Sequence, residues 1–177
     1  MKILIDHIAE SPKTIDFTER VEELNQVCTE RAHAEFRFPP AVDVNIVFYR
    51  SGREVLLHGS FRGVIEGHCS RCLEVYSFAV EKKFDLVLLP NPAETDKKRA
   101  LNQEEMGISF YQGAEINLAP LIQEQVLLTL PIRPLCTEQC RGLCAGCGAN
   151  LNEASCLCAS PKADERAAPF RSLRINR

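Results

Sequence analysis

The chain of 177 residues has no apolar run long enough to span a membrane. Its richest stretch, residues 126–130, falls far short of the roughly 18 residues that a membrane span requires. Charged residues at positions 2, 6, 10 and 16 interrupt the first twenty positions, so we expect no secretory signal peptide. The sequence therefore predicts a cytoplasmic protein without a membrane partner.

Common motifs of catalysis and nucleotide binding are also missing. There is no P-loop and no G-x-G-x-x-G, G-x-S-x-G or H-E-x-x-H pattern. The four histidines, His7, His33, His58 and His68, form no recognisable catalytic set. We expect no catalytic residues and no small-molecule substrate, and we predict that the protein is not an enzyme.

A strong charge of one sign is absent as well, because the formal net charge is only −3. The charge is nevertheless uneven: residues 161–177 hold five basic and two acidic residues, and the rest of the chain is acidic. An acidic body with a basic tail is compatible with nucleic-acid binding without requiring it. If RNA is bound, we expect Arg171, Arg174 and Arg177 of the tail to contact it.

The sequence is rich in cysteine, which makes up nine of its residues. In a reducing compartment these thiols are not expected to form a disulfide framework. Cys28 stands alone and is expected to be a small buried residue. The other eight fall into one C-x2-C pair and one dense segment: Cys69 and Cys72, then Cys136, Cys140, Cys144, Cys147, Cys156 and Cys158.

Thiolates are good ligands for zinc, and a C-x2-C turn places two sulfurs about 3.5 to 4 Å apart, the edge of a tetrahedron around Zn²⁺. Eight cysteines therefore predict one or two structural zinc ions. Loop closure favours a local site of Cys144, Cys147, Cys156 and Cys158, with Cys136 and Cys140 joining the first pair. The alternative joins the two C-x2-C pairs as a zinc ribbon, and the sequence leaves both open. A redox pair, an iron–sulfur cluster and metal-free thiols are less favoured interpretations.

Three long extended segments predict the core of the fold. Apolar residues alternate over residues 42–48 and 55–65, and again over 75–89, with a turn at Ser51-Gly52 and the first cysteine pair at the second reversal. Residues 2–8 and 108–111 are expected to add strands. Asn117 is an expected N-cap of a helix that Pro131 ends, and Thr18 is an expected N-cap of a second helix. The run 91–105 is expected to be a solvated loop.

Together these elements predict an α+β protein with an antiparallel β-meander or barrel-like sheet, a packed helix and a cysteine-rich zinc appendage. We expect a core domain over residues 1–135, a zinc-binding module over 136–160 and a basic C-terminal tail over 161–177.

The order of these pieces resembles the YceD family, the large ribosomal RNA subunit accumulation proteins of bacteria and plastids. The resemblance rests on four blocks: HCSRCLE at 68–74, EINL at 115–118, LLTLPIRPLC at 127–136, and CRGLCAGCG at 140–148 with the asparagines and cysteines after it. PFRSL at 169–173 also looks like the end of that family.

The resemblance implies a non-enzymatic factor that supports synthesis or accumulation of large-subunit ribosomal RNA, or assembly of the ribosome. Ribosomal RNA or ribosome-assembly proteins are the implied partners. The alternative is a zinc-stabilised protein–protein adaptor that makes no direct contact with RNA.

Overall fold

A curled, six-stranded sheet dominates the computed structural model, which describes residues 1–30, 35–91 and 108–158. The main strands pair in the order β2-β4-β5-β6-β7, with β3 added to β5. Their bounds are β2 Lys13–Arg20, β3 Phe36–Arg37, β4 Ala41–Ser51, β5 Glu54–His68, β6 Val75–Pro90 and β7 Ile108–Tyr111. The expected loop after Asn91 and the basic tail lie outside the described residues, as do Arg171, Arg174 and Arg177.

The three long strands confirm the extended segments predicted from the sequence. β4 pairs antiparallel with β5, and β5 pairs antiparallel with β6 over fourteen positions from Val55 to His68. The first cysteine pair lies at the β5–β6 reversal, as expected. The sheet as a whole is mixed, however, because β7 runs parallel to β6. The expectation of a purely antiparallel meander is wrong at this edge, since a parallel neighbour needs a crossover that no local pattern shows.

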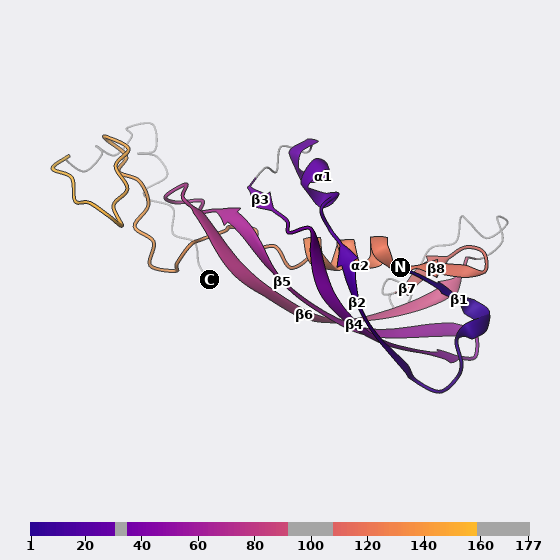
Figure 1. Cartoon of the computed structure of the whole chain (residues 1–177). Helices are drawn as coiled ribbons and strands as arrows, with labels where there is room; N and C mark the ends of the chain where they lie inside the picture. The colour runs from indigo at the N-terminus through magenta and orange to yellow at the C-terminus, as the bar shows by residue number, and fades with distance from the viewer. Residues whose placement is uncertain (31–34, 92–107, 159–177) are drawn as a thin grey trace, which may run out of the picture.

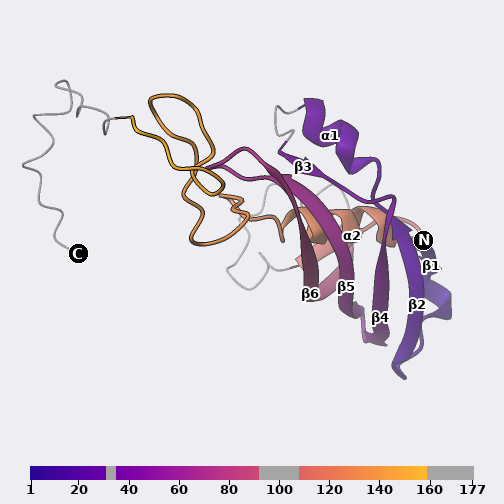
Figure 2. The same ribbon diagram turned by 60° about the vertical axis from the view of Figure 1, so that its left-hand side comes forward.

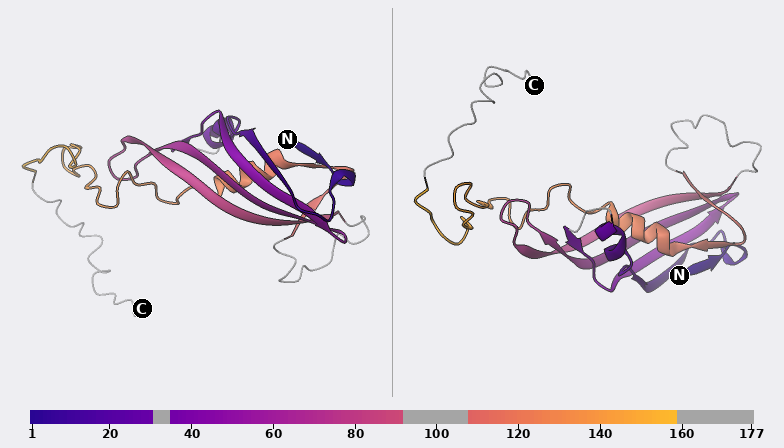
Figure 3. Two further views of the ribbon diagram at one scale, coloured as in Figure 1. Left: turned by 60° about the horizontal axis from the view of Figure 1, so that its bottom comes forward. Right: turned by 90° about the horizontal axis from the view of Figure 1, so that it is seen from above.

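Helix α2, Leu118–Leu127, lies along the concave side of the sheet (Figure 2; Figure 3). The side chain of Asn117 accepts a hydrogen bond from the backbone N–H of Ala119 at 3.2 Å, which confirms the predicted N-cap. Leu118, Ile122 and Val126 recur at helical spacing and are buried in the core. Among the described residues, neither helix has the length and apolar character to cross a membrane.

The N-terminal segment departs from the sequence prediction. Only Lys2–Leu4 forms a strand, β1, which pairs with β8 (Glu115–Asn117), and a 3-10 turn, η1, follows at Ile5–His7. Thr18 lies within β2, opposite Asp43 of β4, so it is not a helix N-cap. Helix α1 begins later, at Leu24, and spans Leu24–Glu30. Strand pairing along the edge of β4 overrides the helical spacing of the preceding residues.

The cysteine-rich segment extends past the β5–β6 reversal, at the end of the sheet opposite the N-terminus (Figure 1). Between residues 131 and 158 the structure has no helix or long strand, only turns and one isolated bridge between Leu143 and Asn150. The residues of this segment contribute nothing to the main apolar core. Its conformation must therefore depend on turns, hydrogen bonds and the cysteines.

Gly59 offers a test of the sheet packing. A Cβ atom at Gly59 would overlap the ring of Phe84, which lies across the backbone of β5 at their paired position. We predict that Gly59→Ala lowers the free energy of unfolding by about 1–3 kcal/mol, because the ring must leave its place in the core. Ser60→Ala, on the other side of the sheet, should change it by less than about 0.5 kcal/mol. Equal chemical-denaturation midpoints for the two variants would contradict this packing.

Candidate metal centres

The structure gathers the eight clustered cysteines into two groups of four. In each group the four sulfur atoms lie within 4.8 Å of one another. The first group, here the hairpin cluster, consists of Cys69, Cys72, Cys136 and Cys140; the second, the terminal cluster, consists of Cys144, Cys147, Cys156 and Cys158. This grouping follows the local pairing considered above and not the zinc-ribbon alternative. Cys28 is buried in the main core and belongs to neither cluster.

The turn that carries Cys69 and Cys72 is closed by hydrogen bonds around the first sulfur. The backbone N–H of Cys69 donates to the carbonyl of Glu74 at 2.9 Å, and that of Leu73 donates to the carbonyl of Cys69 at 2.9 Å. The backbone N–H of Arg71 points at the sulfur of Cys69, 3.5 Å away. N–H donors of this kind stabilise a thiolate, which is the form that binds a metal.

The second C-x2-C turn repeats this geometry position by position. The backbone N–H of Cys144 donates to the carbonyl of Ala149, and that of Gly148 donates to the carbonyl of Cys144, both at 2.8 Å. The backbone N–H of Gly146 lies 3.3 Å from the sulfur of Cys144. Two separate stretches of chain thus form the same turn, in which a backbone N–H points at the first sulfur. This repetition favours metal binding by both turns, which we call the first and second knuckle.

Both turns require a left-handed residue directly after their second cysteine. In the second turn this residue is Gly148, with φ of 74°, and glycine adopts that conformation without strain. In the first turn it is Leu73, with φ of 62°. A residue with a Cβ atom pays about 1–2 kcal/mol for this conformation. The C-x2-C spacing alone does not reveal this strain.

The sulfur separations fit a tetrahedral metal. Cys69 and Cys140 are 3.7 Å apart, as are Cys72 and Cys136. Four sulfurs at the zinc–thiolate distance of about 2.3 Å from one ion would be about 3.8 Å apart. Cys144 and Cys156 are closer, at 3.2 Å. Since all donors in both clusters are thiols, the clusters can hold soft or borderline metal ions and leave no position for a substrate.

The two clusters differ in burial. Cys69, Cys72 and Cys140 are buried and are covered by Tyr76 and Leu135. In the terminal cluster Cys147 and Cys158 are exposed. The hairpin cluster is therefore shielded from solvent, whereas the terminal cluster is accessible to chelators and oxidants.

Arg71 joins the two halves of the hairpin cluster, and Asn152 joins that cluster to the terminal one. The guanidinium of Arg71 donates to the carbonyls of Glu138 and Cys140 at 3.1 and 2.9 Å. The side-chain amide of Asn152, from the loop of the terminal cluster, donates to the sulfur of Cys140 at 3.3 Å and accepts from the backbone N–H of Arg141 at 2.7 Å. Sequence reasoning missed Asn152, because only the folded loop brings it to a sulfur 12 residues away.

Gly142 allows this close approach. Its φ is 73°, and a Cβ atom there would lie 3.0 Å from the carbonyl oxygen of Arg71. Nearby, the backbone N–H of Leu143 donates to that same oxygen at 3.0 Å. His68, the neighbour of Cys69, is exposed, and its Nδ1 lies 3.4 Å from the carbonyl oxygen of Leu73, outside the group of four sulfurs.

The thiols of the hairpin cluster have divergent pKa values. Burial opposes ionisation of Cys69, but hydrogen bonds from the backbone of Cys136, Cys72 and Arg71 outweigh it and lower its pKa to about 6. A backbone hydrogen bond from Glu74 favours the thiolate of Cys72, yet desolvation and the neighbouring thiols raise its pKa to about 12. Burial also opposes ionisation of Cys140, but hydrogen bonds, first among them that from Asn152, lower its pKa, so the thiols that ionise more readily keep their neighbours protonated.

The terminal cluster shows the same division. Hydrogen bonds from the backbone of Cys147 and the thiol of Cys156 lower the pKa of Cys144 to about 6. Hydrogen bonding with the side chains of Cys147 and Cys144 raises the pKa of Cys158 to about 12. Without a cation the four sulfurs of each cluster cannot all be ionised near neutral pH, whereas a divalent metal favours all four thiolates.

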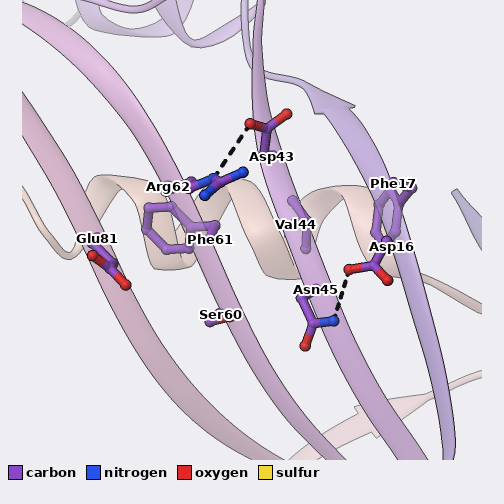
Figure 4. A pocket seen from close by; sticks show the side chains of 9 residues that line it. All are labelled: Asp16, Phe17, Asp43, Val44, Asn45, Ser60, Phe61, Arg62 and Glu81. Atoms are coloured by element: carbon purple, nitrogen blue, oxygen red, sulfur yellow. Dashed lines mark hydrogen bonds and ion pairs between the residues drawn. The ribbon is translucent and has the colours of Figure 1, made fainter.

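A separate hollow on the outer face of the sheet is polar and acidic (Figure 4). The side chain of Asn45 donates to Asp16 at 2.8 Å, and Arg62 lies 3.5 Å from Asp43. Glu81 completes a lining with three carboxylates and one guanidinium. The three carboxylates of this hollow disfavour the binding of a phosphate group there.

The fold and the clusters define a class of protein: a curled β-sheet with a thiol-rich module that can bind two metal ions. A family model described as "Large ribosomal RNA subunit accumulation protein YceD" matches residues 57–174. The chain therefore belongs to the YceD family, as the motifs predicted.

Two curated relatives carry the same description. The chain is 27% identical over 155 residues to "Large ribosomal RNA subunit accumulation protein YCED homolog 1, chloroplastic" of Arabidopsis thaliana, covering 75% of this chain and 48% of that protein. It is 26% identical over 163 residues to the protein of the same name from Zea mays, covering 79% and 55%. The chain spans about half the length of these curated relatives. No solved structure matches it.

The divided pKa values predict a pH-dependent uptake of metal. Cys72 and Cys158, with pKa values of about 12, are protonated at pH 7 in the metal-free protein, and only their thiolates bind metal. Binding of Zn²⁺ should therefore release protons, and affinity should fall as the pH decreases from 8 to 6. Calorimetric titration in buffers of different ionisation enthalpy measures this release. An affinity independent of pH would contradict it.

Proposed function

We propose that this protein is a non-enzymatic factor that supports accumulation of large-subunit ribosomal RNA, with two structural zinc ions. The observation that carries the proposal is the extent of the family match, since residues 57–174 include both cysteine clusters and the long β5–β6 hairpin. The description of that family names accumulation of ribosomal RNA and no reaction. A cytoplasmic location, predicted from the sequence, is part of the proposal and would keep the thiols reduced.

Zinc suits the donor set because it accepts four thiolates in a tetrahedron and has no redox chemistry of its own. In the proposed sites the hairpin and terminal clusters each hold one ion. Four protein ligands close the coordination sphere, so the ions would supply folding energy to the segment after Pro131 and no catalytic step. Support comes from the lack of an apolar core in that segment.

The net charge of the described residues indicates which part of the chain could contact RNA. They include 12 basic and 18 acidic residues, and each zinc with four thiolates would add a net charge of about −2. Phosphates would be repelled by this body, so we propose that direct RNA contact uses the tail arginines Arg171, Arg174 and Arg177. The same charge supports the second candidate, an adaptor that binds proteins of the assembling subunit.

Metal content tests the zinc sites. Protein purified under reducing, anaerobic conditions should contain about two zinc ions per chain, because two closed four-thiolate sets are present. Cys72→Ser and Cys158→Ser should each lower the content by about one ion, as each removes one ligand from a different cluster. Cys28→Ser is the matched control and should leave the content at two.

Iron with visible absorption, or metal-free thiols in such a preparation, would contradict the zinc proposal.

The proposed function is tested in cells. Depletion of the protein should lower mature large-subunit ribosomal RNA relative to small-subunit RNA, because the large subunit alone would lose its factor. Re-expression should restore the ratio, measured by quantitative RNA hybridisation. An unchanged ratio after complete depletion would contradict the proposal.

A further inference from the structure

Leu73 combines backbone strain with exposure. Its φ of 62° lies in the region that favours glycine, and the equivalent residue of the second knuckle is Gly148. Packing does not explain the leucine, because 63% of its surface is exposed at the end of the β5–β6 hairpin. An apolar side chain that is strained and in water contributes little to the stability of the fold. The turn explains the left-handed conformation but not the choice of leucine over glycine, and this choice points to a use of the side chain outside the fold.

Other apolar side chains accompany Leu73 at this end of the sheet. Val75 is 58% exposed and Val64 is 56% exposed. Val75 pairs with His68, and Val64 pairs with Ala79 four residues further along each strand, beyond the Glu66–Ser77 pair. Paired residues and residues four apart in a strand point to the same side, so the two valines share the outer face of the β5–β6 pair. We call Leu73, Val75 and Val64 the tip surface.

The charges around the tip surface are mostly acidic. Glu35, Glu66 and Glu74 are exposed there. Two arginines are near them: Arg37, paired with Glu66, and Arg71, whose guanidinium is already bonded to two backbone carbonyls. The hairpin cluster lies directly behind the turn, and four thiolates with a divalent ion would add negative charge. Three carboxylates against two guanidinium groups leave a small net negative charge, which a bound ion with four thiolates would increase, and this charge favours a basic partner over phosphate.

We propose that the tip surface binds a basic protein of the assembling large ribosomal subunit, with Leu73 as the apolar anchor. This inference rests on the proposed function and adds its partner. An exposed leucine held on a rigid, metal-fixed turn inserts into a pocket without losing much conformational freedom. The acidic rim supplies charge complementarity and steers the basic partner. RNA is the disfavoured occupant of this surface, because neither the leucine nor the rim suits phosphates.

The strain makes stability and binding respond in opposite directions. Leu73→Gly removes the steric cost of the turn, so its thermal midpoint and zinc content should equal or exceed those of the native protein. The same change removes the anchor, so affinity for the partner should fall at least tenfold. Leu73→Met keeps an apolar side chain and should restore most of the affinity. Leu128→Gly truncates a leucine of matched exposure, 62%, at the end of α2 and should bind normally.

The experiment uses the full, zinc-loaded chain and two probes: proteins extracted from salt-washed large ribosomal subunits, and RNA purified from the same subunits. Native protein should bind the extracted proteins, and cross-linking from position 73 followed by mass spectrometry should identify one basic protein. Leu73→Gly should lose this binding and keep its affinity for RNA. Neutralisation of Arg171, Arg174 and Arg177 together should do the reverse.

Unchanged binding of Leu73→Gly to the extracted proteins would overturn the proposal, as would a lack of binding by the native chain. Loss of RNA binding in Leu73→Gly would assign the tip surface to RNA and also overturn it. Rescue of depleted cells distinguishes a failure of the tip-surface proposal from a failure of the proposed function. If the native gene restores ribosomal RNA and Leu73→Gly does so equally, the tip proposal fails and the function stands. If the native gene restores nothing, the proposed function fails.

Discussion

The hairpin cluster is the constraint on which the cysteine-rich segment after Pro131 depends. It joins two segments far apart in sequence, since Cys72 and Cys136 are separated by 64 positions. The β5–β6 hairpin places the turn of Cys69 and Cys72 at the end of the sheet. The chain after α2 returns to that turn, where Cys136 and Cys140 complete the cluster. Two contacts then link this cluster to the terminal segment: the carbonyl of Arg71 accepts from the backbone N–H of Leu143, and the amide of Asn152 donates to the sulfur of Cys140.

The sheet and the cysteine-rich segment are stabilised by different kinds of interaction. Apolar burial holds the sheet and α2, where residues such as Phe61 and Ile122 are almost fully buried. The segment beyond has no share in that core and is ordered by turns, hydrogen bonds and contacts among its clustered thiols. With an ion bound to its four thiolates, the hairpin cluster would add negative charge at one end of the sheet, beside an exposed and strained leucine. The same thiolates that would stabilise the turn by binding metal would therefore also set the charge of the surface that a partner contacts.

Sequence reasoning succeeded where a local pattern carries the information. Alternation predicted β4, β5 and β6, and Asn117 predicted the start of α2, because both signals depend on residues close in the chain. It failed at Thr18, which lies in a strand, and it placed the strand at 108–111 without its parallel orientation, because pairing with distant strands decides both. The eight cysteines were identified from spacing, but their division into clusters needed the fold. The strain at Leu73 and the sulfur contact of Asn152 left no signal in the sequence.

The central claim is that two closed zinc centres, each with four thiolates, hold the segment after Pro131 to the sheet. X-ray absorption at the zinc edge tests it most directly, because the spectrum reports the identity and number of the atoms bound to the metal. The account predicts four sulfur neighbours at about 2.3 Å from zinc and no nitrogen or oxygen shell, with the same result for both ions. A shell containing oxygen or nitrogen in place of sulfur would contradict it.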